Sequence, residues 1–477
     1  MAQPPIVDVL AHLTGGNTSG GEIRETVMRK DGYFHLDTPR MIARLKQMHA
    51  NTYNYMIWNS PSDWDDLQKE FLPAAQKAHI NVWIYLVPPT ESRFKYAHPF
   101  RVDYVRWASE LAKLSLRYPC LQAWAIDDFF ANFKLFTPEY VKQLQQTAHS
   151  INPNFRFYPD LQLDSLDSEL VSKYAPYIDG IIAPYIDMPY YNTQRTNSLR
   201  PQITAANKVL EQWKLPLYVL IYVGRHLGSP LEPTPQYAHD AIQIAESEMR
   251  NGHLAGIISY GTPLETYPAR TRTNEALDGN GRLSLEVTKY PNKAGDWAQA
   301  SQTVRIDPKS PKYWLSFWHY DRWGEGDHPK CLVKEVLIDD KVMWSADPAG
   351  DTSATWFDGG SLEGTLDLTN VLKDKKTAKL TLRLRTLQNF SKLPLDVSFD
   401  RLTARGFTIT DPRFETGKGW KVSDIGGAML AAIDHYDPNT FRELFTTVST
   451  MFGRYQHPVW HSSTHKSGVL HSETPTR

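Results

Sequence analysis

Two adjacent carboxylates, Asp127 and Asp128, follow directly after the apolar run Leu121–Ile126. Neighbouring carboxyl groups repel each other as anions, so the pKa of one of them is expected to rise. A raised carboxyl pKa is what a general acid requires near neutral pH. The pair could instead cap a helix or form a turn, but the next helix is expected only at Thr137-Pro138, beyond the reach of these side chains. We therefore interpret the pair as a candidate catalytic site.

The pair belongs to a pattern of eight short apolar runs that alternate with helix-period segments over residues 4–265. Runs rich in β-branched and aromatic residues are typical of parallel strands covered on both sides. No glycine-rich phosphate turn follows an early run, which disfavours an open doubly wound sheet. The sequence thus predicts an α/β fold, with a (β/α)8 TIM barrel over residues 1–275. The predicted strands are Ile6–His12, Asn51–Trp58, Asn81–Val87, Leu121–Ile126, Phe155–Pro159, Gly180–Tyr185, Leu217–Val223 and Gly256–Tyr260.

Three helices between these strands are expected to begin at a threonine followed by a proline. A threonine hydroxyl can cap the first turn, and proline fits the first helical position because its missing N–H is not needed there. The three pairs are Thr38-Pro39, Thr137-Pro138 and Thr234-Pro235.

After residue 280 the pattern changes to strands without intervening helices. Several runs alternate apolar and polar residues, and turn residues separate them, so we expect a β-sandwich over residues 280–412. Residues 413–477 are expected to form an irregular extension with a helix at Thr440–Phe452. The strands predicted for the sandwich are Trp314–His319, Lys334–Ile338, Lys341–Trp344, Leu362–Leu368, Lys379–Leu387 and Leu395–Phe399.

The ends of the barrel strands supply the rest of the candidate site, because active sites of such barrels lie at the C-terminal ends of the strands. Carboxylates there can move protons or stabilise an oxocarbenium-like centre, and aromatic faces can stack on sugar rings. The expected catalytic residues are Asp127, Asp128 and Asp187. The expected substrate-binding residues are Asp8, His12, Trp58, Asn59, Tyr85, Tyr158, Asp160, Gln162, Tyr185, Tyr222, Arg225 and Tyr260.

A resemblance to a known family rests on residues 40–130. The stretches Ala50–Tyr55, Asn81–Ile84 and Ala123–Phe129 resemble the barrel of glycoside hydrolase family 84 and, more broadly, the substrate-assisted hexosaminidases and chitinases. In that family an adjacent aspartate pair ends the fourth strand. The resemblance implies that Asp127 orients and polarises the 2-acetamido group of the substrate, and that Asp128 acts as general acid and then base. The acetamido oxygen would be the nucleophile and would form an oxazoline intermediate.

Other mechanisms stay open, because the run Val7–His12 lacks the glycine-aromatic signature of that family. Asp128 could work with Asp187 or Asp160 in a two-carboxylate mechanism, whose stereochemistry depends on the distance between the carboxyl groups. A barrel that binds polysaccharide without cleaving it is a further alternative.

The composition excludes several other classes of function. The 477-residue chain has 52 Lys and Arg against 53 Asp and Glu, so no basic excess indicates nucleic acid or an anionic membrane as a partner. No apolar run approaches the ~20 residues of a membrane span. The two cysteines are expected to be buried thiols, and no ligand spacing or nucleotide motif predicts a metal or a cofactor. A carbohydrate is the expected partner, and the start Met1–Pro5, read as a methionine before a mature N-terminus, favours a secreted or periplasmic protein.

Overall fold

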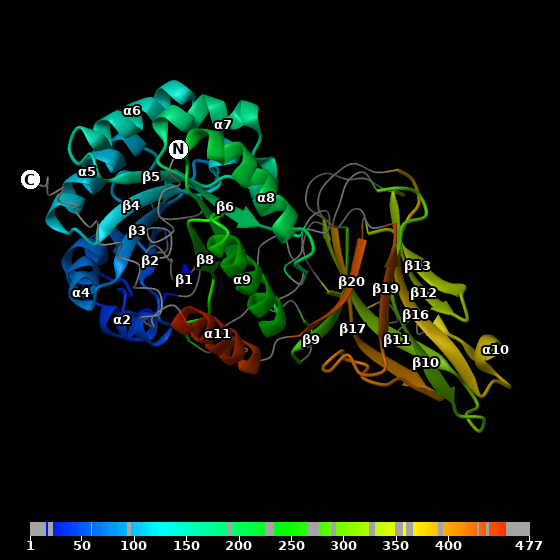
Figure 1. The fold of residues 1–477 in the computed structure, drawn as a ribbon. Coiled ribbons are helices and arrows are strands. Elements are labelled where there is room, and N and C mark those ends of the chain that lie inside the picture. The colour runs from blue at the N-terminus through cyan, green and yellow to red at the C-terminus, as the bar shows by residue number, and fades with distance from the viewer. Residues whose placement is uncertain are drawn as a thin grey trace, which may run out of the picture.

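The computed structural model has two regions that lie side by side (Figure 1). We call residues 16–265 the αβ region and residues 276–435 the antiparallel region. The residues that the structure describes are 16–17, 22–58, 60–92, 97–187, 193, 195–224, 233–265, 276–277, 279–287, 292–323, 330–348, 356–358, 366–389, 395–426, 429–435 and 438–454.

The strands of the αβ region are parallel and form two four-stranded sheets. Their orders are β1-β8-β7-β6 and β2-β3-β4-β5, and a parallel bridge between Asp160 and Ile182 joins the end of β5 to β6. Seven of the eight predicted strands are confirmed, whereas the first prediction, Ile6–His12, lies outside the described residues. The bounds are β1 (Gly16–Asn17), β2 (Thr52–Ile57), β3 (Asn81–Leu86), β4 (Leu121–Ile126), β5 (Arg156–Pro159), β6 (Ile181–Tyr185), β7 (Leu217–Tyr222) and β8 (Gly256–Tyr260).

Helices follow these strands and cover the outer side of the sheets. Thr137 and Thr234 cap their helices as predicted, each accepting a hydrogen bond from the N–H three residues later. The prediction that Thr38 caps its helix was wrong by one residue. The cap is Asp37, whose carboxylate accepts a hydrogen bond from the Arg40 N–H at 3.1 Å. None of the described helices is long and apolar enough to cross a membrane. The helices are α2 (Thr38–Gln47), α3 (Asp63–Asp66), α4 (Leu72–Ala78), α5 (Tyr104–Arg117), α6 (Pro138–His149), α7 (Ser168–Tyr174), α8 (Leu199–Leu210) and α9 (Pro235–Arg250).

Side chains of the parallel strands alternate between two apolar layers, as the period of two in a strand requires. In β4, Trp124 and Ile126 face the helices, whereas Ala123 and Ala125 face inward. The inward layer receives side chains from both sheets, so the two sheets enclose it. We call this layer the inner cluster: Met56, Trp58, Trp83, Tyr85, Val87, Ala97, Ala123, Ala125, Tyr158, Ile182, Tyr218, Leu220 and Ile258.

The antiparallel region contains two six-stranded sheets whose apolar faces share one buried core. One sheet has the order β13-β12-β16-β10-β18 with β19 paired to β10, and the other has β14-β11-β17-β9-β20 with β15 paired to β11. The strands are β9 (Gly281–Val287), β10 (Trp297–Ile306), β11 (Trp314–Trp323), β12 (Leu332–Ile338), β13 (Lys341–Ala346), β14 (Trp356–Asp358), β15 (Leu366–Asp367), β16 (Thr377–Thr386), β17 (Leu395–Arg405), β18 (Phe407–Thr408), β19 (Lys421–Ile425) and β20 (Met429–His435).

The prediction of an irregular extension from residue 413 was wrong for two segments. β19 pairs with β10, and β20 pairs with the whole of β9, so both belong to the antiparallel sheets. Their stability comes from tertiary pairing, which a short local pattern does not reveal. The same reason explains why β9 and β10 were not predicted.

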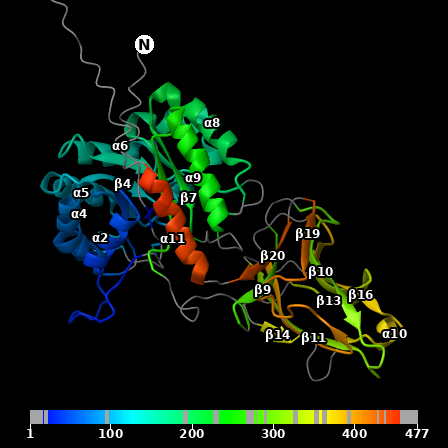
Figure 2. The same cartoon turned by 60° about the horizontal axis from the view of Figure 1, so that its bottom comes forward.

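The last described helix, α11 (Pro438–Gly453), returns to the αβ region and lies beside α9 (Figure 2). It buries Leu444, Val448 and Phe452 against that region, and the Arg44 guanidinium lies 3.7 Å from the centre of the Phe445 ring. The helix predicted at Thr440–Phe452 is therefore confirmed. The end of the antiparallel region is thus followed by a helix that covers the αβ region.

Candidate functional site

Several polar and aromatic residues meet where the inward faces of the parallel strands end. The alternation that places Ala123 and Ala125 in the inner cluster directs Asp127 to the same side, and the alternation in β5 does the same for Asp160. We call the set at this end the mouth residues: Trp58, Tyr85, Asp127, Asp128, Asp160, Tyr222 and Tyr260. Residues distant in the sequence thus come together at one edge of the sheets.

The backbone at Asp127 and Asp128 turns sharply. The Asp127 N–H continues the strand pairing by donating to the Leu86 carbonyl at 3.1 Å. Asp128 then adopts a left-handed conformation with φ of 42°, which aspartate tolerates better than most residues. The amide of Asn132 donates to the Asp128 carbonyl at 2.9 Å and holds the turn. Asp128 therefore leaves the strand alternation and lies half-buried at the rim of the mouth.

Asp160 lies deeper and next to the pair. Its N–H donates to the carbonyl of Ile126 at 3.3 Å, and its side chain is 1% exposed. The Tyr85 hydroxyl donates a hydrogen bond to its carboxyl group. Burial raises the pKa of Asp160 well above its usual value, and the charges of Asp127 and Asp128 add to this, while the Tyr85 hydrogen bond opposes it. Three carboxyl groups therefore interact at one place.

Phenols and an indole surround these carboxyl groups. Trp58 packs edge-on against Tyr85 with ring centres 5.9 Å apart, and Tyr222 packs edge-on against Tyr260 at 5.3 Å. Burial raises the pKa of Tyr222 well above its usual value, and the charge of Asp160 raises it further. The phenols of Tyr85 and Tyr222 thus stay protonated near neutral pH, so each can donate a hydrogen bond.

Two predicted binding residues lie away from the carboxyl groups of the mouth. Tyr158 is buried in the inner cluster, where its ring centre lies 4.8 Å from Trp83 and 5.1 Å from Tyr218. Gln162 is half-buried, and its backbone carbonyl accepts a hydrogen bond from the Ser165 N–H at 3.0 Å. The packing of Tyr158 favours a structural role, and substrate binding by either residue stays a prediction.

Asp187 and Tyr185 lie on the opposite face of β6, towards the helices. Tyr185 shares the outer layer with Ile181 and Ala183, and the period of two places Asp187 on the same side. The Ser198 hydroxyl, which precedes α8, donates to the Asp187 carboxylate at 2.9 Å. Burial raises the pKa of Asp187, while Ser198 lowers it. Catalysis by Asp187 stays a prediction, and these surroundings favour a role in holding the start of α8.

Replacing Asp187 by Asn is accordingly expected to leave kcat within about threefold of wild type, because the amide can still accept the Ser198 hydrogen bond. Steady-state kinetics on a cleaved glycoside would measure this. A loss comparable to that caused by changing Asp128 would show that Asp187 takes part in the chemistry.

Four predicted binding residues cannot be placed against this geometry. Asp8, His12, Asn59 and Arg225 lie outside the described residues.

No protein-family model matches the chain, and no curated protein matches it. It is similar to a solved beta-glucuronidase from an uncultured Clostridium species, with 14% identity, 52% of this chain and 43% of that chain covered, and a TM-score of 0.36. The chain thus spans less than half of that relative. It is also similar to endoglucanase Cel5A from Thermotoga maritima, at 12% identity over 57% of this chain and 97% of that chain with a TM-score of 0.39. PbGH5A, a glycoside hydrolase family 5 enzyme from Prevotella bryantii B14, has 9% identity over 55% and 91% of the two chains and a TM-score of 0.38.

These neighbours are named as a beta-glucuronidase, an endoglucanase and a glycoside hydrolase family 5 enzyme. Identities and TM-scores this low carry no chemistry over to this chain, whose chemistry depends on its own residues.

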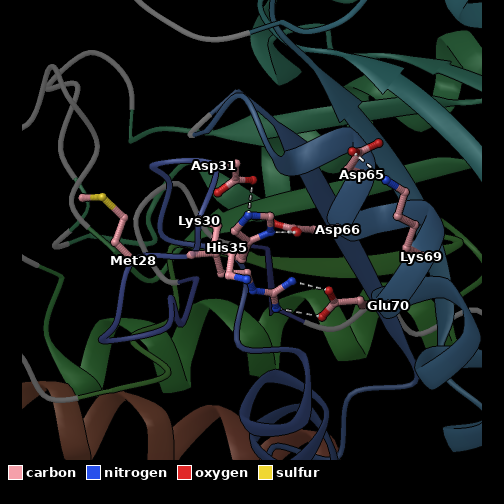
Figure 3. A pocket seen from close by; sticks show the side chains of 9 residues that line it. Met28, Lys30, Asp31, His35, Asp65, Asp66, Lys69 and Glu70 are labelled. Atoms are coloured by element: carbon pink, nitrogen blue, oxygen red, sulfur yellow. Dashed lines mark hydrogen bonds and ion pairs between the residues drawn. The ribbon is translucent and has the colours of Figure 1, made fainter.

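The sequence did not indicate a second polar cluster, which lines a pocket of about 620 Å³ between the segment before α2 and the helices after β2 (Figure 3). One ligand atom each of His35, Asp66 and Glu70 lies within 4.8 Å of the others, a spacing compatible with a metal ion. The His35 ring, however, contacts Asp66 at 2.5 Å and Asp31 at 2.7 Å, and the Arg29 guanidinium contacts Glu70 at 2.5 Å. These contacts already compensate the charges, so we interpret the cluster as an ion-pair network.

His35 connects the segment before α2 to α3. Burial disfavours its charged form, but hydrogen bonds to Asp66 and Asp31 raise the pKa of the ring overall. A raised histidine pKa contributes stability that is complete below the unfolded-state pKa and is lost as pH rises through the folded-state pKa. The other charged groups that line the pocket are Arg29, Lys30, Asp65, Lys69 and Glu70.

The wild type is therefore expected to lose more stability between about pH 6 and pH 8 than the His35→Gln variant, since only the wild type releases this proton. Urea midpoints across that range would measure the difference. His239→Gln, which changes a half-buried histidine of α9, is the control and should follow the wild-type slope more closely. Parallel curves for wild type and His35→Gln would contradict the assignment.

Proposed function

We propose that this chain is a glycoside hydrolase that cleaves an oligo- or polysaccharide at the mouth residues. The observation that carries the proposal is the meeting of Asp127, Asp128 and Asp160 with phenols and an indole at the ends of parallel strands. Carboxyl groups supply the proton transfers of glycoside cleavage. The half-buried rings of Tyr222 and Tyr260 supply faces for a sugar ring, whereas Trp58 and Tyr85 are buried.

Asp128 is the proposed general acid and base. It is half-buried at the rim, so a glycosidic oxygen can reach it, and its left-handed turn projects it away from the strand. Asp127, on the inward face beside it, is the proposed orienting partner. For a 2-acetamido sugar, as the resemblance to glycoside hydrolase family 84 implies, Asp127 would polarise the acetamido group while its oxygen attacks the anomeric carbon.

The alternative within the same reaction class is a two-carboxylate mechanism. Asp160 would be the nearer second carboxylate, because its N–H donates to the carbonyl of Ile126, the residue directly before Asp127. Asp187 would first have to leave its hydrogen bond with Ser198. Retention through a covalent intermediate and inversion through an activated water are then distinguished by the stereochemistry of the product.

The proposed architecture is a (β/α)8 barrel followed by a β-sandwich. Pairing of β1 with β8, the bridge from β5 to β6 and the inner cluster shared by both sheets support a closed barrel. The common core of the two antiparallel sheets supports the sandwich, which then includes β19 and β20 and extends to residue 435.

A screen of aryl glycosides and polysaccharides with wild type tests the proposal. Cleavage of a sugar substrate that Asp128→Asn abolishes would support both the function and the site. Activity confined to 2-acetamido sugars would support the substrate-assisted mechanism. Polysaccharide binding without turnover would instead identify a non-catalytic barrel and overturn the enzyme assignment.

A further inference from the structure

We propose that Asp160 is a positioning residue that retains a proton and, together with Tyr85, holds the base of the mouth beneath Asp127 and Asp128. This inference rests on the proposed function and assigns a role that is not that of a second ionised carboxylate. Asp127 and Asp128 are then the two carboxyl groups that act directly on the substrate.

The backbone first places Asp160 next to the pair. The Asp160 N–H donates to the carbonyl of Ile126, the residue directly before Asp127, at 3.3 Å. β4 and β5 are neighbouring parallel strands in register, with Ala125 opposite Tyr158. The carboxyl groups of Asp127 and Asp160 thus follow equivalent inward positions of adjacent strands.

The burial of Asp160 limits its possible roles. Its side chain is 1% exposed and that of Tyr85 is completely buried, so the pair lies beneath the surface that a substrate reaches. Half-buried Asp128 lies at the rim by comparison. A group with this little exposure is suited to holding another side chain and not to contacting a sugar.

The partners of Asp160 do not compensate a negative charge. Within the described residues it accepts a hydrogen bond from Tyr85, and no lysine, arginine or histidine forms an ion pair with it. Its charged neighbours are instead the carboxylates Asp127 and Asp128. A buried anion beside two other anions is strongly unfavourable, and the neutral acid relieves both the burial and the repulsion.

A protonated Asp160 carboxyl group can connect Tyr85 to a neighbouring carboxylate by hydrogen bonds. A neutral carboxylic acid has one O–H donor as well as acceptor oxygens, so Asp160 can accept from Tyr85 and donate to a neighbouring carboxylate. Asp127 follows the inward position of β4 that is equivalent to the one Asp160 follows in β5, which makes Asp127 the favoured acceptor. A donated hydrogen bond would fix the orientation of the Asp127 carboxyl group. Among the described residues, the other titratable groups that face this place are Tyr85, Tyr222 and Tyr260.

Two substitutions at Asp160 distinguish a positioning role from catalysis by an ionised Asp160 carboxylate. Asp160→Asn keeps an N–H donor and the shape of the neutral acid, so kcat should stay within about threefold of wild type with an unchanged acid limb of the pH profile. Asp160→Ala removes the contact and should lower kcat by about 10²-fold, with KM changed much less. If Asp160 were an ionised nucleophile, Asp160→Asn would abolish turnover as Asp128→Asn does, and the proposal would be overturned.

The protonation state can be measured without a substrate. Infrared spectra near neutral pH should show a carbonyl band of protonated carboxyl groups in the wild type. Asp160→Asn should remove the component of this band that belongs to Asp160, while the component of the general acid Asp128 persists. Asp164→Asn, which makes the same change at an exposed position after β5, should leave the band in place. A wild type without the Asp160 component would overturn the inference even if the enzyme is active. A wild type that cleaves no sugar but shows the Asp160 component would refute the proposed function and leave Asp160 protonated as inferred.

Discussion

Replacing Asp128 by Asn is expected to lower kcat for glycoside cleavage by about 10²–10⁴-fold, the range that general acid–base catalysis contributes. The change removes the proton donor and little else. Asparagine has nearly the same shape and is, with aspartate, among the residues that best tolerate the left-handed conformation of position 128. The Asn132 hydrogen bond to the backbone carbonyl of residue 128 does not depend on the side chain.

The size of this drop in kcat should depend on the leaving group of the substrate. A nitrophenolate departs without protonation, so aryl glycosides with acidic leaving groups should keep more activity in Asp128→Asn than natural glycosides do. The matched control is Asp164→Asn, the same chemical change at an exposed aspartate after β5, which should keep wild-type rates. Equal rates for Asp128→Asn and wild type across leaving groups would remove Asp128 from the mechanism.

The strands that carry the mouth could be predicted from the sequence because each is a short run rich in apolar and aromatic residues. The same property hides the direction of the side chains. β4 and β6 are both buried along most of their length, so their sequences show no alternation that marks the inner face. Asp127 and Asp187 consequently looked equivalent, although the structure directs Asp127 inward and Asp187 towards Ser198.

Features that depend on tertiary contacts were harder to predict. The pairing of β20 with β9 joins segments about 150 residues apart, and neither strand alone has a strong local pattern. The choice of Asp37 over Thr38 as helix cap depends on the backbone geometry of one residue. The network around His35 joins residues that no motif connects, so only the fold reveals it.

Charged residues inside the antiparallel region are another feature that the sequence does not reveal, since a lysine in a strand pattern is expected to face solvent. Lys334 on β12 is 1% exposed and forms an ion pair with Asp321 on β11, which belongs to the other sheet. The Lys334 ammonium also lies 2.8 Å from Nδ1 of His319. Burial, with the charge of Lys334, lowers the pKa of His319 to about 3, so the neutral ring accepts this hydrogen bond.

Asp321→Asn is therefore expected to destabilise the antiparallel region by about 3–5 kcal/mol, because it leaves the Lys334 charge buried without its counter-charge. Guanidinium unfolding followed by tryptophan fluorescence would measure the change. The matched control is Asp340→Asn, which alters an exposed pair with Lys379 in the same region and should cost less than about 1 kcal/mol. Asparagine suits the left-handed backbone of position 340, so that control tests charge alone.

A double variant distinguishes the cost of removing Asp321 alone from the contribution of the Asp321–Lys334 ion pair to stability. Joining Asp321→Leu to Lys334→Met removes both charges and fills the space with apolar groups, which in other buried pairs is neutral or stabilising by about 1–4 kcal/mol. The double variant should thus recover most of the stability that Asp321→Asn loses. In Asp321→Asn itself, a rise in pH that neutralises the buried lysine should reduce the loss in stability. A pH-independent loss that the double variant does not recover would show that Asp321 acts through packing and not through its charge.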